Sequence, residues 1–136
     1  MRTTEDILTT TADTLAYTGL WTGDHFAHGT ALTVTAAIYH AATGHVPDAL
    51  HADDDAALAL ITANPQTMYA IQALSDCLDT EPPTDGDTGR PDHIEHIERY
   101  AAEPALGADA PPTTSEVIGR ILRAAHTHDH PKGQAA

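Results

Sequence analysis

The chain has few basic residues and few aromatic ones. Six Lys and Arg residues stand against twenty Asp and Glu residues, which gives a formal net charge of −14 at pH 7. This charge repels the phosphates of nucleic acids and of anionic membranes, so we expect neither as a direct partner. A basic protein could bind such an acidic surface, although the same charge also serves solubility alone.

Cysteine and long apolar runs are scarce as well. Cys77 is the only cysteine, so no disulfide can form within the chain, as is typical of proteins in a reducing compartment. No run approaches the roughly 20 apolar residues of a membrane span. The start, M-R-T-T-E-D, lacks the apolar stretch of a signal peptide. We therefore expect a cytoplasmic protein without membrane contact.

The shortage of aromatic residues favours helices. With one Trp, one Phe and four Tyr, the core must be built from Leu, Ile, Val and Ala, whereas strands prefer β-branched and aromatic residues. A chain of 136 residues has the size of one domain. We predict a mainly α, compact single domain of five to six short helices over residues 1–126, followed by a flexible polar tail over 127–136.

Helix-start signals recur along the chain. Candidate N-terminal caps stand at Thr3 or Thr4, at the acidic run Asp53–Asp55, at Asn64 before Pro65, and at Asp92. Thr113 and Glu116 form a capping box. We read Asp53–Asp55 as a helix start rather than a cation site. The apolar spacing predicts that Leu58, Ile61 and Leu122 face inward.

The segment from Thr30 to Thr43 has almost no charge and is rich in Ala. Its length and composition predict a buried helix that ends at Gly44 and allows its neighbours to approach closely. Leu32 and Val34 alternate with threonines, so a short strand near 31–35 is the alternative for its first residues.

The loop from Gly19 to Gly29, G-L-W-T-G-D-H-F-A-H-G, holds the only Trp and the only Phe. Its rings either anchor the helices on both sides or form a binding surface. The candidate binding residues are Trp21, Asp24, His25, Phe26 and His28. His25 and His28 form H-x-x-H beside an acid, and such side chains can bind zinc. The sequence offers no clear further ligands, so we predict no cofactor and leave a metal open.

Two other groups of histidines are candidate metal ligands. His93 and His96 share a helix face, but Ile94 and Ile97 are expected to take the inward side and leave the histidines near solvent. The tail histidines are expected to bind a metal only opportunistically: His126, His128 and His130.

No catalytic constellation stands out. The chain has no G-x-S-x-G, no P-loop and no dinucleotide-binding glycine pattern, and it contains only two serines. We therefore predict no catalytic residues and favour a non-enzymatic protein, with enzymatic activity left open.

Several short motifs resemble an uncharacterised small domain family of actinobacteria and their phages. The motifs are G-L-W-T-G-D at 19–24, H-G at 28–29, A-A-I at 36–38, A-A-T-G at 41–44 and T-S-E-V-I at 114–118. The likeness extends from Thr4 to Ala125. The family often has Cys where Thr33 stands, and W-N-D at 100–102, where this chain has Y-A-A. The resemblance implies a helical accessory domain of unknown activity.

The preferred hypothesis is a binding or regulatory accessory protein that acts through protein contacts, with homodimer formation open. One alternative is an acidic nucleic-acid mimic that blocks a DNA-binding protein. The other is a metal-dependent enzyme that uses Asp24, His25 and His28.

Overall fold

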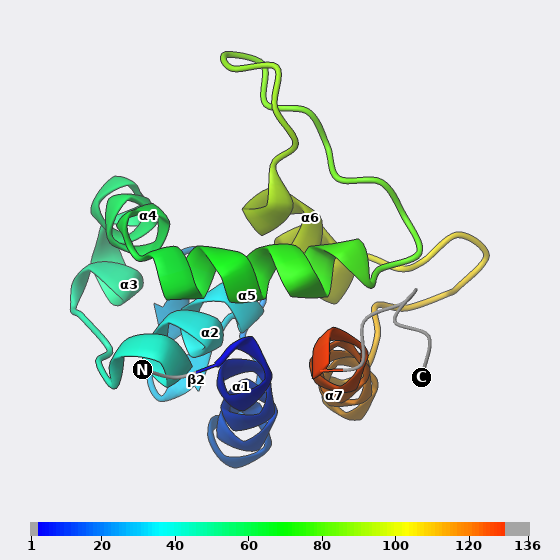
Figure 1. Ribbon diagram of the computed structural model, residues 1–136, viewed down its shortest axis with the longest axis horizontal. Coiled ribbons are helices and arrows are strands. Elements are labelled where there is room, and N and C mark those ends of the chain that lie inside the picture. Colours follow the sequence, from blue (N-terminus) through cyan, green and yellow to red (C-terminus); the bar gives the residue numbers. More distant parts are fainter. Residues whose placement is uncertain (1–2, 130–136) are drawn as a thin grey trace.

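The chain is mainly α-helical in the computed structural model, which describes residues 3–129 (Figure 1). Within these residues seven helices and one antiparallel pair of short strands follow one another. In chain order they are α1 (Thr4–Thr18), β1 (Ala27–His28), β2 (Ala31–Leu32), α2 (Val34–Thr43), α3 (Ala49–Ala52), α4 (Asp54–Ala63), α5 (Pro65–Asp76), α6 (His93–Ala102) and α7 (Thr114–Asp129). No helix of the described residues is long and apolar enough to cross a membrane.

The prediction of a mainly α, compact single domain is confirmed. The strand alternative near 31–35 is also confirmed, because β2 covers Ala31–Leu32 and pairs with β1. The central helix consequently begins at Val34 and not at Thr30. The four-residue α3 is an addition that the sequence did not predict.

Helix α2 lies at the centre of the molecule. Every residue from Val34 to Tyr39 is buried, and α1, α5, α6 and α4 pack around them. Thr33 Oγ1 caps the helix by accepting from Ala36 N at 3.2 Å. Gly44 ends it in the left-handed conformation, with φ of 79°. In Figure 1, α5 crosses in front of α2, and α1 lies beside α7.

The last two helices have different neighbours. α7 packs mainly on α1 and also on α5, whereas α6 packs on α5 and α2. Residues 103–113 join the two helices without forming a helix or strand. This connection and the different packing partners leave a space between α6 and α7.

The predicted caps are found at the helix starts. Side chains accept hydrogen bonds from the first turn of five helices, at Thr3, Asp53, Asn64, Asp92 and Thr113. The Glu116 carboxylate completes the capping box by accepting from Thr113 N at 2.9 Å, which lowers the pKa of Glu116.

Three expectations about the helices need correction or fall outside the described part. Leu58 and Leu122 are 41% and 44% exposed, because Ala57 and Ile61 form the inward face of α4, and Val117, Ile121 and Ala125 that of α7. α7 continues to Asp129, past the predicted start of the tail at 127. The rest of that predicted tail, 130–136, lies outside the described residues, and so does His130.

A long loop between α5 and α6 projects from the body of the molecule (Figure 1). Thr84 pairs with Pro91 across its base, and Asp92 N donates to Pro83 O at 2.7 Å. At the tip, Asp85 Oδ1 accepts from the backbone N–H groups of Thr88 and Asp87, which lowers the pKa of Asp85.

The contact of α6 with α2 contains a carboxyl group. Glu98 Oε1 accepts from Thr35 Oγ1 at 3.0 Å and from Thr35 N at 3.4 Å, at the N-terminus of α2. Burial raises the pKa of Glu98 to about 7, although hydrogen bonds from Thr35 and Thr33 work in the opposite direction. The folded protein therefore holds this proton at higher pH than the unfolded chain does.

The raised pKa of Glu98 predicts a stability that falls with rising pH. Between the ordinary Glu pKa of 4.5 and about 7, the folded state binds more protons than the unfolded state, so the free energy of unfolding decreases across this window. We expect Glu98→Gln to remove this contribution, which amounts to roughly 3 kcal/mol. The measurement is denaturant unfolding of both proteins from pH about 4 to about 8.

Glu103→Gln is the matched control, since Glu103 is exposed at the end of the same helix. Glu103→Gln also replaces a carboxyl group by an amide, but at the surface. The difference in the free energy of unfolding between this variant and the natural chain should therefore change little with pH. A Glu98→Gln difference that is equally flat would contradict the role given to the buried carboxyl.

Candidate functional site

Trp21 packs on its own loop instead of plugging the core. Its indole stacks on His28, with ring centroids 4.4 Å apart and planes at 17°, and its Nε1 donates to Asp24 O at 2.9 Å. Gly23 lies against the indole, because a Cβ at this position would come within 2.5 Å of Trp21 Cζ2. Trp21 is partly buried and His28 is exposed, so the stacked pair forms part of the surface.

Phe26 has the anchoring role, one of the two alternatives that the sequence left open for the aromatic rings. Its side chain is partly buried and packs against the hydrophobic core. Its backbone N donates to Leu50 O at 2.9 Å, and its backbone O accepts from Thr33 N at 2.9 Å. The loop is thereby joined both to α3 and to the start of α2.

His25 has a left-handed backbone, with φ of 68°, which is uncommon for a residue other than glycine. Its Nδ1 lies 2.9 Å from Asp54 Oδ1 at the start of α4, and both side chains are largely exposed. The acidic run is a helix start, as predicted, since Asp53 Oδ1 accepts from Ala56 N. The ion pair adds a second role for Asp54, as a partner of the loop.

The metal hypothesis receives no support from this geometry. His25 turns to Asp54, His28 stacks on Trp21, and Asp24 contributes its backbone carbonyl to the loop. Among residues 3–129 no group of three or more His, Cys, Asp or Glu side chains could hold a metal ion.

The histidines of α6 are more buried than the sequence suggested. His96 is only 4% exposed, and its Nδ1 and Nε2 each lie 2.7 Å from a hydroxyl, that of Ser75 and that of Thr80 respectively. His93 Nδ1 lies 2.8 Å from the same Ser75 Oγ. The expectation of solvated histidines was wrong because His96 faces Ser75 of α5 and Thr80 after it, and His93, four residues before Ile97, lies on the inward face too.

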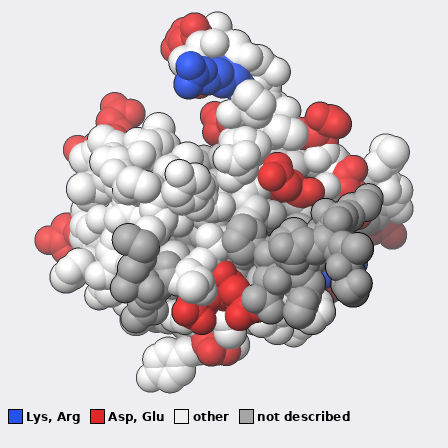
Figure 2. Space-filling model, in the orientation of Figure 1, with Lys and Arg blue, Asp and Glu red and all other residues white. Residues whose placement is uncertain are grey.

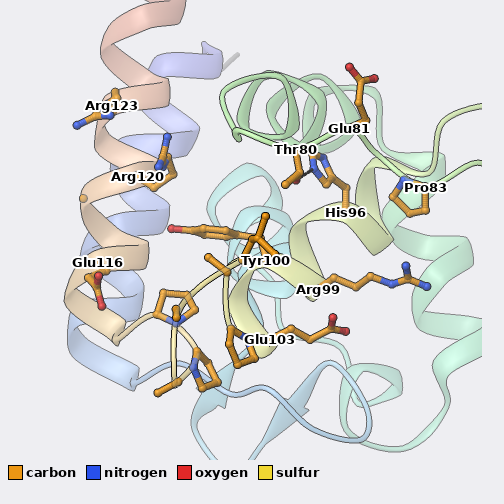
Figure 3. Close-up of a pocket in the computed structure, with 18 residues that line it drawn as sticks. Thr80, Glu81, Pro83, His96, Arg99, Tyr100, Glu103, Glu116, Arg120 and Arg123 are labelled. Atoms are coloured by element: carbon orange, nitrogen blue, oxygen red, sulfur yellow. Dashed lines mark hydrogen bonds between the residues drawn. The ribbon is translucent and has the colours of Figure 1, made fainter.

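A groove of about 780 Å³ opens between α6 and α7 (Figure 3). Tyr100 points its hydroxyl across the groove toward α7, and Thr80 lies with His96 at one end. Apolar side chains from both connecting loops form much of the remaining wall, namely Pro83, Pro104, Ala105, Leu106, Ala108, Ala110, Pro111 and Pro112.

Basic side chains gather at this groove. Three of the six basic residues of the chain line it, Arg99, Arg120 and Arg123, together with only three of the twenty acidic ones. In Figure 2 acidic side chains are scattered over the visible surface, whereas basic atoms are seen most clearly near the tip of the α5–α6 loop. The groove is therefore much less negative than the rest of the surface.

The arginines of the groove differ in their partners. Arg120 donates from Nη1 to Cys77 O and from Nη2 to Asp79 Oδ2, both at 3.2 Å, so part of its five-donor guanidinium stays available. Arg99 extends away from α7 and pairs with Glu95 at 2.9 Å. Arg123 has no hydrogen bond or ion pair within the described part of the chain.

Thr80 and His96 have the spacing of a nucleophile and a general base. In a catalytic triad a carboxylate meets the other nitrogen of the imidazole, whereas here that partner is the Ser75 hydroxyl. Ser75 orients His96, and no carboxylate of the described residues hydrogen-bonds to this imidazole. A buried carboxylate normally stabilises the imidazolium that forms during catalysis. Ligand binding is accordingly better supported than hydroxyl activation.

The sequence singled out the aromatic loop and missed the groove. A usable signal was present, because three of the six basic residues fall within 99–123, around a proline-rich connection. Only the fold shows that Thr80, in the connection that follows α5, meets the same groove.

Gly23→Ala should disturb the Trp21–His28 stack, because the new methyl group overlaps the indole. We expect a red shift of Trp21 fluorescence. We also expect the free energy of unfolding to fall by about 1 kcal/mol, which is at the low end of the usual cost of overpacking because the ring is partly exposed. Gly86→Ala is the control, since open space surrounds Gly86. Equal effects of the two substitutions would contradict this account of the loop.

Comparisons with known proteins add nothing to the assignment: no family model, no curated protein and no solved structure matches the chain. The resemblance to a small actinobacterial and phage domain family therefore stays a prediction.

Proposed function

We propose that this protein is a non-enzymatic binding module whose ligand is an organic anion with an apolar body, held in the α6–α7 groove. The observation that carries the proposal is the gathering of three arginines at one groove of a chain with net charge −14. A volume of about 780 Å³ lies within the range typical of small-molecule sites.

The groove offers complementary groups for both parts of such a ligand. Arg123 supplies a guanidinium that has no hydrogen-bond or ion-pair partner among residues 3–129, and Arg120 has donors left after its two bonds. Guanidinium groups bind carboxylates and phosphates through paired charge-assisted hydrogen bonds. Tyr100 and Leu106, with the prolines of the wall, provide apolar contact for the rest of the ligand.

Octanoate is a suitable first probe, with octanol and octylamine as matched ligands of the same apolar length. We expect octanoate to bind at least about tenfold more tightly than either, because a hydrogen bond to a charged group contributes roughly 1.5–3 kcal/mol. Arg123→Gln should weaken octanoate binding by about tenfold for the same reason. Isothermal titration calorimetry measures both effects.

Arg90→Gln is the control for Arg123→Gln, because it removes the same charge from the α5–α6 loop, outside the groove. It should leave octanoate binding unchanged. The proposal fails if octanoate does not bind, or if octanol binds equally well.

A second candidate function, contact with a basic protein segment through the Gly19–Gly29 loop, is supported by a different observation. Trp21 and His28 form a stacked surface pair, and His25 is held to Asp54 in a strained conformation. Such strain is often found at functional sites. Asp24 and Asp53–Asp55 add negative charge around the pair. Under this second candidate the protein is a cytoplasmic accessory protein that acts through protein contacts, which is the hypothesis preferred from the sequence.

Titration with a Lys-rich peptide tests this second candidate. Trp21 fluorescence should respond, the response should weaken at high salt, and Asp54→Asn should reduce it several-fold because it removes a negative charge beside the stacked pair. Competition by DNA for the peptide would favour the nucleic-acid mimic. Sedimentation equilibrium of the protein alone would reveal a homodimer. A salt-independent response, or none, would contradict the candidate.

A further inference from the structure

His96 connects the groove to a buried chain of hydrogen bonds. Its ring lines the groove with one nitrogen at Thr80 Oγ1, while the other nitrogen meets Ser75 Oγ, and Ser75 in turn meets His93 Nδ1. The three contacts measure 2.7, 2.7 and 2.8 Å. These four side chains form the Ser75–Thr80 relay, which ends at the groove with the Thr80 hydroxyl.

The relay can accept one added proton while all three of its hydrogen bonds are kept. A protonated His96 donates from Nδ1 to Ser75 Oγ and from Nε2 to Thr80 Oγ1. Ser75 then donates its own proton to Nδ1 of a neutral His93. Thr80 no longer donates to His96, so its hydroxyl proton is free to point toward an acceptor in the groove.

The pKa of His96 lies below its ordinary value in the free protein, and burial is the largest cause. His93 also lowers this pKa, while a hydrogen bond with the Thr80 backbone and the charges of Asp76 and Glu81 raise it. The other titratable and charged groups around the groove, from the elements packed there, are Asp79, Arg99, Tyr100, Glu103, Glu116, Arg120 and Arg123.

We propose that the groove binds its anionic ligand together with a proton, which His96 takes up, and that the Thr80 hydroxyl donates to the ligand. An anion near His96 favours the imidazolium, and by thermodynamic reciprocity the imidazolium favours the anion. The inference rests on the proposed function, because it specifies how the same groove recognises its ligand. It adds Thr80 and His96 to the ligand-recognising residues.

The probe is octanesulfonate, whose charge stays constant across the pH range used. We expect its affinity for the natural chain to rise about tenfold from pH about 8 to about 5.5, which corresponds to an increase of about one unit in the pKa of His96 on binding. Calorimetry in buffers of different ionisation enthalpy should show proton uptake. A nuclear magnetic resonance titration of the His96 ring, with and without the probe, should show the increase directly.

Thr80→Val removes the relay hydroxyl at an exposed position, and it should abolish most of the pH dependence while the protein stays folded. His96→Gln should do the same, and if this buried substitution prevents folding, the ring titration of the natural chain decides instead. His45→Gln is the control, since His45 is exposed between α2 and α3, and it should leave the pH dependence unchanged.

The outcomes separate the two proposals. If neither octanoate nor octanesulfonate binds at any pH, the proposed function fails, and the inference fails with it. If octanesulfonate binds with an affinity independent of pH and leaves the His96 titration unchanged, the groove remains a binding site and the proton-linked inference is overturned. A pH dependence that survives in Thr80→Val overturns the part given to the Thr80 hydroxyl.

Discussion

The burial of α2 on nearly all sides is the constraint on which the other elements depend. This helix carries no Asp, Glu, Lys or Arg, and three of its buried residues are alanines, Ala36, Ala37 and Ala41. Small side chains let α1, α5 and α6 approach closely, so close packing compensates for the shortage of large aromatic residues. The buried start of α2 needs hydrogen-bond partners, and Thr33 and Glu98 supply them.

Most of the fold could be predicted from the sequence because its signals are local. Caps such as Asn64 and Asp92 act within one helical turn, and the left-handed end at Gly44 needs only glycine. Leu58 was misplaced because a short apolar pattern fits more than one helix face, and only the neighbours of α4 select the face that contains Ala57 and Ile61.

The candidate site was much harder to predict. The aromatic loop is continuous in sequence, so its glycines and rings stand out. The groove combines Thr80, His96, Tyr100, Arg120 and Arg123, which lie on three separate segments, and it exists because α6 and α7 choose different packing partners. Ser75 likewise looks like an ordinary helix residue until α6 brings two imidazoles against it.

The projecting α5–α6 loop has a consequence for engineering the chain. Its two sides meet through the Thr84–Pro91 pairing, and its tip around Gly86 is exposed and stands clear of the helices. Because the residues on both sides of the tip are already paired, extra residues at the tip need not separate α5 from α6. Foreign peptide grafts, fluorescent labels or immobilisation handles can therefore be introduced there with the helical body kept intact.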